Sequence, residues 1–312
     1  MIEETIVTDT FQDGLSEQGS PLENRSAEAP VPAPSTEIAD AEDSLPTANE
    51  KAEEEAPVEK DFVNEPDELD PQKREFLLKR VERIERMADN YAAVEARIAQ
   101  ICEPLEKDPA QILLYIPHRG VESKPLMEAS LAGVRCFSED RPKIMKQVTD
   151  LFPETSWIYT GRIENTVMDE LVRSSNTVFV VKRTLYLSII NLWCSYRGLT
   201  ASVLFDANLS GDGSQPGVAP AYCINSAREM THMPYLTLAG LAIDLPEDPE
   251  EAAKKLEEAR KLNARIQKQF SEKCERIQAK EIMIKNFCDY EVAIEGGATI
   301  LPVPWRDVIV TE

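Results

Sequence analysis

The stretch from residue 177 to residue 206, TVFVVKRTLYLSIINLWCSYRGLTASVLFD, constrains the fold of this chain more than any other. Residues 177–181 are β-branched or aromatic without polar alternation, which predicts a short strand covered on both faces. Residues 201–205 predict a second strand. Between them lies a helical segment, so the whole unit is strand, helix, strand, which is typical of a layered α/β domain.

The helix inside this unit has apolar residues on almost every side between residues 185 and 193, so we expect it to be buried nearly all round. Thr184 is expected to cap its start through the hydroxyl, and Gly198 to end it with a left-handed turn. The apolar run is far shorter than the ~20 residues that span a bilayer, so we expect no membrane insertion.

Strand and helix signals also alternate on either side of the central unit, between about residues 110 and 244. The predicted strands cover residues 112–116 and 156–159, and the predicted helices cover about 126–131, 142–151 and 165–173. This alternation predicts an α/β fold (possibly α+β) with a central mixed or parallel sheet and helices on its faces. The Gly, Ser and Pro loop at 206–220 is long enough to have a function.

Two long amphipathic helices are expected to flank the α/β part, each opened by an Asp-Pro pair, at residues 70–71 and 248–249. The first would end before Pro104, and the second would run to about Asn286, followed by closing strands at 300–303 and 308–310. They could pair as an antiparallel hairpin or form a coiled coil between chains. The second falls short of a clean heptad pattern, so it could instead pack on its own domain. The expected contact residues are Leu77, Val81, Ile84, Tyr91, Ile98, Leu256, Ile266 and Phe270.

The N-terminal tail differs sharply in charge from the rest of the chain. Residues 1–70 contain 21 acidic and 3 basic side chains, whereas the remainder is close to neutral despite a net charge of −22 overall. The tail also contains few large apolar residues, which predicts that it is disordered. It would be either a solubilising leader or an acidic arm that binds a basic surface on a partner. The predicted divisions are therefore 1–70, 71–103, 104–247 and 248–312. Nucleic acid is not expected as a direct ligand, because phosphate binding needs a basic surface.

The first 15 residues lack the basic start and apolar centre of a signal peptide, and the six cysteines form no C-x-x-C pair. We therefore expect a reducing cytoplasmic setting, or one within an intracellularly assembled particle.

One loop has a partial metal-binding pattern. Oxygen side chains recur at every second position, with glycine at the sixth, as in the first half of an EF-hand loop, and the candidate ligands are Asp206, Asn208, Ser210, Asp212 and Ser214. Gly217 stands at the twelfth position, where a bidentate glutamate belongs, so any Ca²⁺ affinity should be weak.

No catalytic signature stands out elsewhere. The two histidines, His118 and His232, could pair with Cys136 or Cys223 as a thiol nucleophile, but no spacing selects a pair. Phosphate-binding glycine motifs and paired zinc ligands are absent from the sequence.

These observations together favour a non-enzymatic structural or assembly component, for example of a virion-like particle. It would bind itself or protein partners through its long helices, and would need no cofactor and no small-molecule ligand. Three alternatives remain open. The chain could be a regulatory adaptor or inhibitor that acts through the acidic arm, or an enzyme with its site in the loops after residues 116 and 205. It could also be a chaperone-like adaptor that binds a partner helix along the apolar stripe from Leu77 to Ile101.

Overall fold

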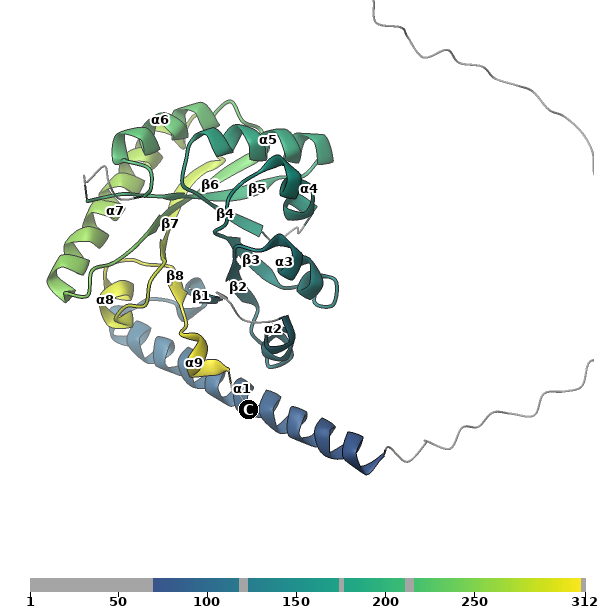
Figure 1. Ribbon diagram of the computed structural model, residues 1–312. Coiled ribbons are helices and arrows are strands. Elements are labelled where there is room, and N and C mark those ends of the chain that lie inside the picture. The colour runs from purple at the N-terminus through teal and green to yellow at the C-terminus, as the bar shows by residue number, and fades with distance from the viewer. Residues whose placement is uncertain (1–69, 118–122, 174–176, 211–215, 310–312) are drawn as a thin grey trace, which may run out of the picture. The chain divides into compact units, whose positions relative to one another are not determined.

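A closed barrel of eight parallel strands forms the centre of the molecule (Figure 1). The computed structural model describes residues 70–117, 123–173, 177–210 and 216–309. Each strand pairs with the next along the chain, and β1 pairs with β8 to close the ring. The strands are β1 Leu113–Pro117, β2 Cys136–Glu139, β3 Ser156–Tyr159, β4 Thr177–Val181, β5 Ala201–Asp206, β6 Leu236–Ile243, β7 Ile277–Ile284 and β8 Ile300–Pro302.

Helices surround this barrel, as Figure 1 shows. They are α1 Pro71–Cys102, α2 Ser123–Leu131, α3 Pro142–Thr149, α4 Asn165–Arg173, α5 Leu185–Arg197, α6 Pro220–Met230, α7 Pro249–Phe270, α8 Tyr290–Glu295 and α9 Trp305–Val308. Two short 3₁₀ helices, η1 Glu103–Leu105 and η2 Pro109–Gln111, connect α1 to β1. No helix in the described part of the chain is long and apolar enough to cross a membrane.

The interior of the barrel contains a buried layer to which each strand contributes one residue. Because side chains alternate along a strand, one set faces inward and the other faces the helices. The inward set forms a buried cluster of its own: Tyr115, Cys136, Ile158, Val180, Leu204, Ala242, Met283 and Ile300. The outward set, with Phe137, Trp157, Phe179 and Phe205 among it, belongs to the larger core beneath the helices.

The predicted fold class is wrong: the sheet is closed into a barrel, and two long helices do not flank an open sheet. The helix α7 belongs to the ring and packs on β6 and β7 and against α6 and α8, whereas α1 contacts α2, α8 and α9. A strand that is apolar on both faces is equally expected in an open parallel sheet and in a barrel. Closure therefore could not be read from any single segment.

Several local predictions are confirmed, and others are corrected. Strands β3 and β4 and helix α4 have the predicted bounds, and the Asp70 side chain caps α1 by accepting from the Gln72 amide. The second long helix, expected to reach Asn286, ends at Phe270, and residues 277–284 form β7 instead. Gln278 and Lys280 are exposed and alternate with buried neighbours, which is the pattern of a strand. The strand was missed because no glycine or proline separates it from the preceding helix.

Two further corrections concern α5 and the C-terminal segment. Thr184 makes no capping hydrogen bond through its side chain, and α5 is buried only at Leu187, Ile190 and Cys194. Leu192 is largely exposed, so the helix is not enclosed on all sides. Val308 lies in α9, where a strand was expected, and β8 is the final strand of the described residues.

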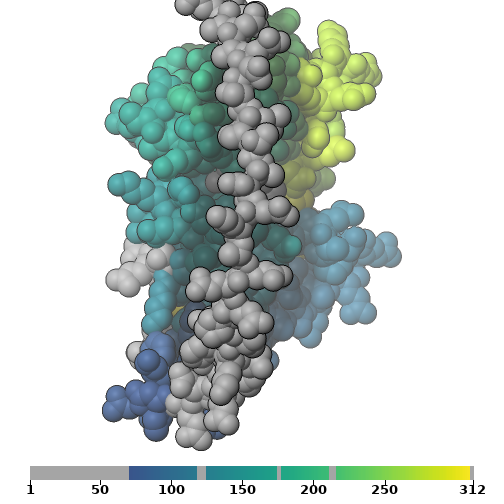
Figure 2. Space-filling view, turned by 90° about the vertical axis from the view of Figure 1, so that its right-hand side faces the viewer, coloured from purple at the N-terminus to yellow at the C-terminus, as the bar shows by residue number. Residues whose placement is uncertain are grey.

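A buried ion pair attaches α1 to α2. The Arg83 guanidinium donates from Nε and Nη2 to both oxygens of Glu128, at 2.8 and 2.9 Å, and both side chains are almost fully buried. Arg80 approaches the same carboxylate from its Nε at 3.2 Å. The turns of α1 before this pair, dark blue at the lower edge of Figure 2, carry exposed apolar side chains at Phe76, Leu78 and Val81.

Candidate functional site

The carboxyl ends of the strands surround a cavity of about 1070 Å³. Tyr115, Val180 and Met283 belong to the inward-facing layer of the barrel and line the cavity from within. In enzymes with this architecture, the loops that follow the strands build the active site at this end of the barrel. The other lining residues are Pro117, Ser138, Glu139, Asp140, Thr160, Gly161, Arg162, Lys182, Arg183, Tyr186, Asp206, Pro216, Gly217, Asp244 and Lys285.

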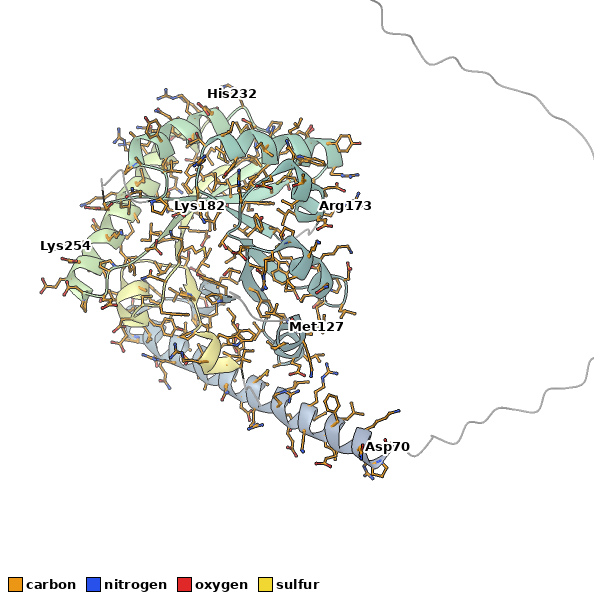
Figure 3. All side chains as sticks on the ribbon, viewed as in Figure 1. Asp70, Met127, Arg173, Lys182, His232 and Lys254 are labelled. Atoms are coloured by element: carbon orange, nitrogen blue, oxygen red, sulfur yellow. The ribbon has the colours of Figure 1, made fainter. Side chains whose placement is uncertain are left out.

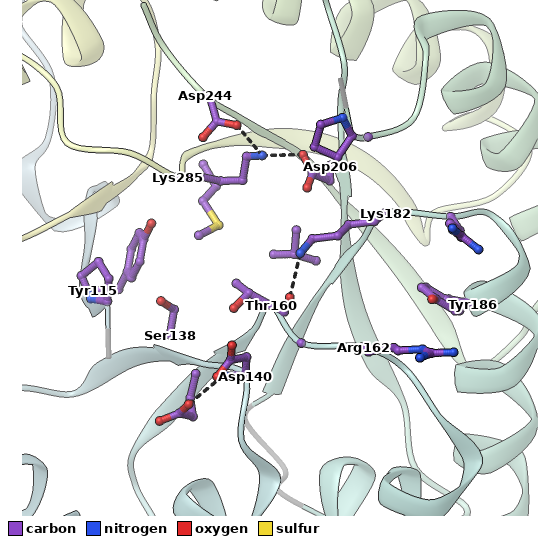
Figure 4. Close-up of a pocket in the computed structure, with 18 residues that line it drawn as sticks. Tyr115, Ser138, Asp140, Thr160, Arg162, Lys182, Tyr186, Asp206, Asp244 and Lys285 are labelled. Atoms are coloured by element: carbon purple, nitrogen blue, oxygen red, sulfur yellow. Dashed lines mark hydrogen bonds and ion pairs between the residues drawn. The ribbon is translucent and has the colours of Figure 1, made fainter. Parts of the chain in front are cut away.

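Three charged residues from neighbouring strands form one cluster in this cavity. Lys285, directly after β7, places its Nζ 2.6 Å from Asp206 Oδ1 at the end of β5 and 2.7 Å from Asp244 Oδ2 after β6 (Figure 4). The Asp206 side chain is 3% exposed and that of Lys285 is 20% exposed, whereas Asp244 is 58% exposed. The buried carboxylate of Asp206 therefore depends on the Lys285 ammonium for its neutralisation.

The same contacts fix the charge of Lys285. Burial lowers the pKa of its ammonium, but the charges of Asp206 and Asp244 and their hydrogen bonds outweigh burial and raise the pKa above its ordinary value. These contacts favour the ammonium form, which has no lone pair to act as a nucleophile. Lys285 is thus a fixed cation.

A second pair lies at the end of β2. The carboxylate of Glu139 is fully buried and accepts from the Arg141 guanidinium, at 2.9 Å, and from the backbone amides of Asp140 and Arg141. These contacts neutralise Glu139 and fix the turn that leads into α3. Asp140, the next residue, also lines the cavity.

The loops after β3 and β4 supply the remaining cations of the cavity. The Lys182 ammonium donates to the Thr160 carbonyl oxygen at 3.0 Å, and Arg162 pairs at the surface with Glu164 at 3.0 Å. Figure 4 shows Arg162 and Tyr186 on the side of the cavity away from the Asp206–Lys285–Asp244 cluster, with Lys182 between the two regions. Lys182, Arg183 and Arg162 are all exposed.

Two tyrosines support these walls as hydrogen-bond donors. The Tyr115 hydroxyl donates to the Ile284 carbonyl oxygen at 2.8 Å, and the Tyr159 hydroxyl donates to the Arg162 carbonyl oxygen at 2.9 Å. Burial raises the pKa of Tyr115 far above its ordinary value and that of Tyr159 to about 12. Both phenols therefore remain protonated at neutral pH.

The predicted calcium ligands are only partly placed by the structure. Asp206 lies in the cavity with its carboxylate on Lys285, and the Asn208 side-chain oxygen accepts from the amide and hydroxyl of Ser210. Asp212 and Ser214 lie outside the described residues. Among the residues that are described, no three His, Cys, Asp or Glu side chains are grouped for a metal ion. The Ca²⁺ site stays a prediction.

The predicted interaction residues separate into two groups. Ile98, Leu256, Ile266 and Phe270 are buried in the core of this chain, because α7 and the second half of α1 pack on the barrel assembly. Ile84 and Tyr91 are partly buried against the same core. Leu77 and Val81, in the first turns of α1, are exposed.

The cysteines and histidines considered for catalysis do not meet in the described structure. Cys136 faces the barrel interior, and Cys223 is buried in α6, with burial raising the pKa of each thiol to about 12. His232 lies at the periphery beyond α6, well away from Lys182 (Figure 3). His118 lies outside the described residues.

The loops after residues 116 and 205, named in one of the sequence-based alternatives, do contribute to the cavity through Pro117 and Asp206. Neither Lys182 nor Lys285 was among the site residues predicted from the sequence. A usable signal existed in both cases, because each is the first charged residue after a continuous apolar run that ends a strand.

Comparison with known proteins gives a consistent result. No family model matches the chain. A pyridoxal phosphate homeostasis protein of Pseudomonas aeruginosa is 28% identical over 172 residues, which cover 54% of this chain and 73% of that protein. The protein of the same description from Aquifex aeolicus is 21% identical over 221 residues, or 69% of this chain and 94% of that protein. The chain is similar to pyridoxal phosphate homeostasis proteins.

Solved structures share the fold. A protein of unknown function from Bifidobacterium adolescentis matches with a TM-score of 0.63 and 21% identity, covering 73% of this chain and 96% of that chain. PipY of Synechococcus elongatus PCC7942, with pyridoxal phosphate (PLP) bound, matches with a TM-score of 0.58 and 17% identity, covering 72% of this chain and 100% of that chain. At these identities the structural matches establish the fold, a barrel of the kind that holds PLP in PipY.

These similarities overturn the function predicted from the sequence. A structural or assembly component of a virion-like particle is wrong, because the relatives are homeostasis proteins for a small molecule. The expectations of no cofactor and no small-molecule ligand are wrong for the same reason, since a structure of the same fold contains PLP. The long helices suggested assembly, but α7 and the second half of α1 pack within the chain.

Proposed function

We propose that this chain binds PLP, or a closely related phosphorylated ring compound, in the cavity at the carboxyl ends of its strands, and serves in the homeostasis of that compound. The observation that carries the proposal is the cavity itself, which is large enough for a small cofactor and is lined by both lysine and arginine. The similarity of the chain to PLP homeostasis proteins supports it.

PLP presents a phosphate, an aldehyde and a pyridine nitrogen to a protein. When bound, it supplies an electrophilic carbonyl that reacts with primary amines and a ring that accepts electrons. A site for it therefore needs cations or amide donors for the phosphate and a polar partner for the ring.

The residues of the cavity fit reversible binding of such a molecule. Lys182, Arg183 and Arg162 are basic groups of the lining that suit a phosphate, and Ser138, Asp140 and the Asp206–Lys285–Asp244 cluster are polar groups of the lining that suit the ring. They do not fit covalent attachment at Lys285, because its ammonium is held between Asp206 and Asp244.

The test is a calorimetric titration of the full chain with PLP, combined with hydrogen–deuterium exchange. We expect saturable binding and slower exchange in the loops after β2, β3 and β4. The exposed face of α7 around Lys254, on the outside of the barrel (Figure 3), should be unchanged. Absence of saturation, or protection confined to α7, would contradict the proposal.

A further inference from the structure

The charges of the cavity are distributed unevenly around its mouth. Its lining contains four acidic and four basic residues. Lys285 and two of the acids form the cluster of β5, β6 and β7, and a third acid, Glu139, is paired with Arg141. The other three basic residues, Arg162, Lys182 and Arg183, all follow β3 or β4.

Barrels of this class frequently hold a phosphate in the loops after the seventh and eighth strands, at the start of a short extra helix. In this chain several donors of those loops are already used in internal hydrogen bonds. Pro302 and Pro304 have no amide hydrogen, and the amide of Val303 between them donates to the Tyr115 carbonyl oxygen at 2.8 Å. Residues 302–304 at the end of β8 therefore offer no free amide to a phosphate.

The loop after β7 is committed to internal contacts as well. The Asn286 side chain donates to the Leu245 carbonyl oxygen at 2.7 Å and accepts from the Leu245 amide at 2.8 Å. The Asp289 carboxylate accepts from the Glu291 amide and occupies the start of α8 with a negative charge. An anionic group would be repelled at this position.

The wall formed after β3 and β4 has the opposite character. Lys182 and Arg183 are consecutive and both are exposed, and within the described part of the chain Lys182 donates to a neutral carbonyl, that of Thr160. The next residue, Thr184, does not cap α5 with its side chain, and the first turn of α5 contains no acidic residue. Arg162 is bound only to the exposed Glu164 among the pairs described, so its guanidinium can turn towards a ligand.

We propose that the anionic group of the ligand is held by Lys182, Arg183 and Arg162 on the β3–β4 wall, with the ring directed towards the Asp206–Lys285–Asp244 cluster. The ligand is bound there without a covalent bond to Lys285. This inference rests on the proposed function for the identity of the ligand. It extends the proposed function by naming the part of the cavity that binds the phosphate.

The test compares PLP, pyridoxal and inorganic phosphate on the full chain by equilibrium dialysis and calorimetry. Pyridoxal lacks the phosphate and should bind at least about tenfold more weakly than PLP, because charge-assisted hydrogen bonds to the phosphate are lost. The double variant Lys182→Met with Arg183→Met should lose at least about tenfold in PLP affinity and leave pyridoxal unchanged.

The matched control is Lys254→Met with Arg265→Met, two exposed residues of α7 that give the same change in charge. It should leave all three affinities unchanged. The single variant Arg183→Met provides an independent measurement if the double variant does not fold. Loss of pyridoxal binding equal to loss of PLP binding would overturn the inference, and so would an unchanged preference for PLP in the double variant.

Covalent trapping provides a second readout. After reduction of the PLP-loaded chain with borohydride, peptide mass spectrometry should find no ligand-derived mass on Lys285. A ligand-derived mass on Lys285 or Lys182 would show that the aldehyde reacts with that lysine, and would overturn the inference.

The experiments also separate the two proposals. If PLP does not bind but inorganic phosphate binds and depends on Lys182 and Arg183, the proposed function fails and the anion site stands. If no anion binds at all, both fail.

Discussion

Replacement of Lys285 by methionine tests whether the charged cluster stabilises the barrel. The change removes the ammonium and keeps a side chain of similar length, which leaves Asp206 as an unpaired carboxylate that is only 3% exposed. Removal of one partner from a fully buried ion pair costs about 3–5 kcal/mol. Lys285 is itself 20% exposed, so some water already reaches the pair, and we expect a smaller loss of about 2–3 kcal/mol.

The measurement is the free energy of unfolding in urea at pH 7, for the full chain. A loss of this size should also lower the melting temperature by about 5–10 °C in a domain of this length. Asp244→Asn should cost less than about 1 kcal/mol, because Asp244 is 58% exposed and its pairing is screened by water. Lys285→Met combined with Asp206→Asn should be more stable than Lys285→Met alone, because the buried charge is then removed.

The reasoning would be refuted if Lys285→Met were no less stable than Lys254→Met, an exposed control on α7. It would also be refuted if the double variant with Asp206→Asn were the least stable of the set. Either result would mean that the Asp206 carboxylate does not depend on the ammonium.

Three further predictions concern other contacts. Because the pKa of Lys285 is raised, its stabilising effect is complete below the ordinary lysine pKa of about 10.4 and is lost as the pH rises through the folded value. In urea titrations at alkaline pH, the difference in unfolding free energy between the unsubstituted chain and Lys285→Met should therefore become smaller. The hydrogen bonds from Arg83 lower the pKa of Glu128, so its stabilisation is present above about pH 4.3 and is lost as the pH falls through the lowered value. Glu128→Gln should therefore cost about 2–3 kcal/mol of unfolding free energy at pH 7, and this cost should shrink as the pH of the urea titration falls through that value. Gly240→Ala should destabilise the barrel by at least about 2 kcal/mol in thermal melting, because the new Cβ would lie 1.9 Å from the Glu281 carbonyl oxygen where β6 and β7 approach at a register shift. An unchanged melting temperature would contradict that contact.

The sequence predicted those elements whose signal is local. The bounds of β3, α4 and β4 are as expected, because β-branched runs and helical spacing are properties of a few consecutive residues. The extent of α7 was wrong because no glycine or proline stands between Phe270 and the start of β7. Closure depends on the pairing of β1 with β8, whose partners Leu113 and Ile300 are far apart in the chain, and no local pattern contains that information.

The site was harder to predict for a related reason. The strand ends that line the cavity contribute one or a few polar residues each, and none of these forms a motif by itself. The closed barrel brings Asp206 and Lys285 into contact and places Lys182 at the same cavity. The two lysines nevertheless differ in what surrounds them, because Lys285 is held by two carboxylates and Lys182 by a neutral carbonyl. We therefore expect their substitutions to separate: Lys285→Met should lower stability and leave the preference for PLP over pyridoxal largely intact, whereas Lys182→Met with Arg183→Met should do the reverse. If both variants changed the same property, it would be incorrect to assign stability to Lys285 and phosphate binding to Lys182 and Arg183.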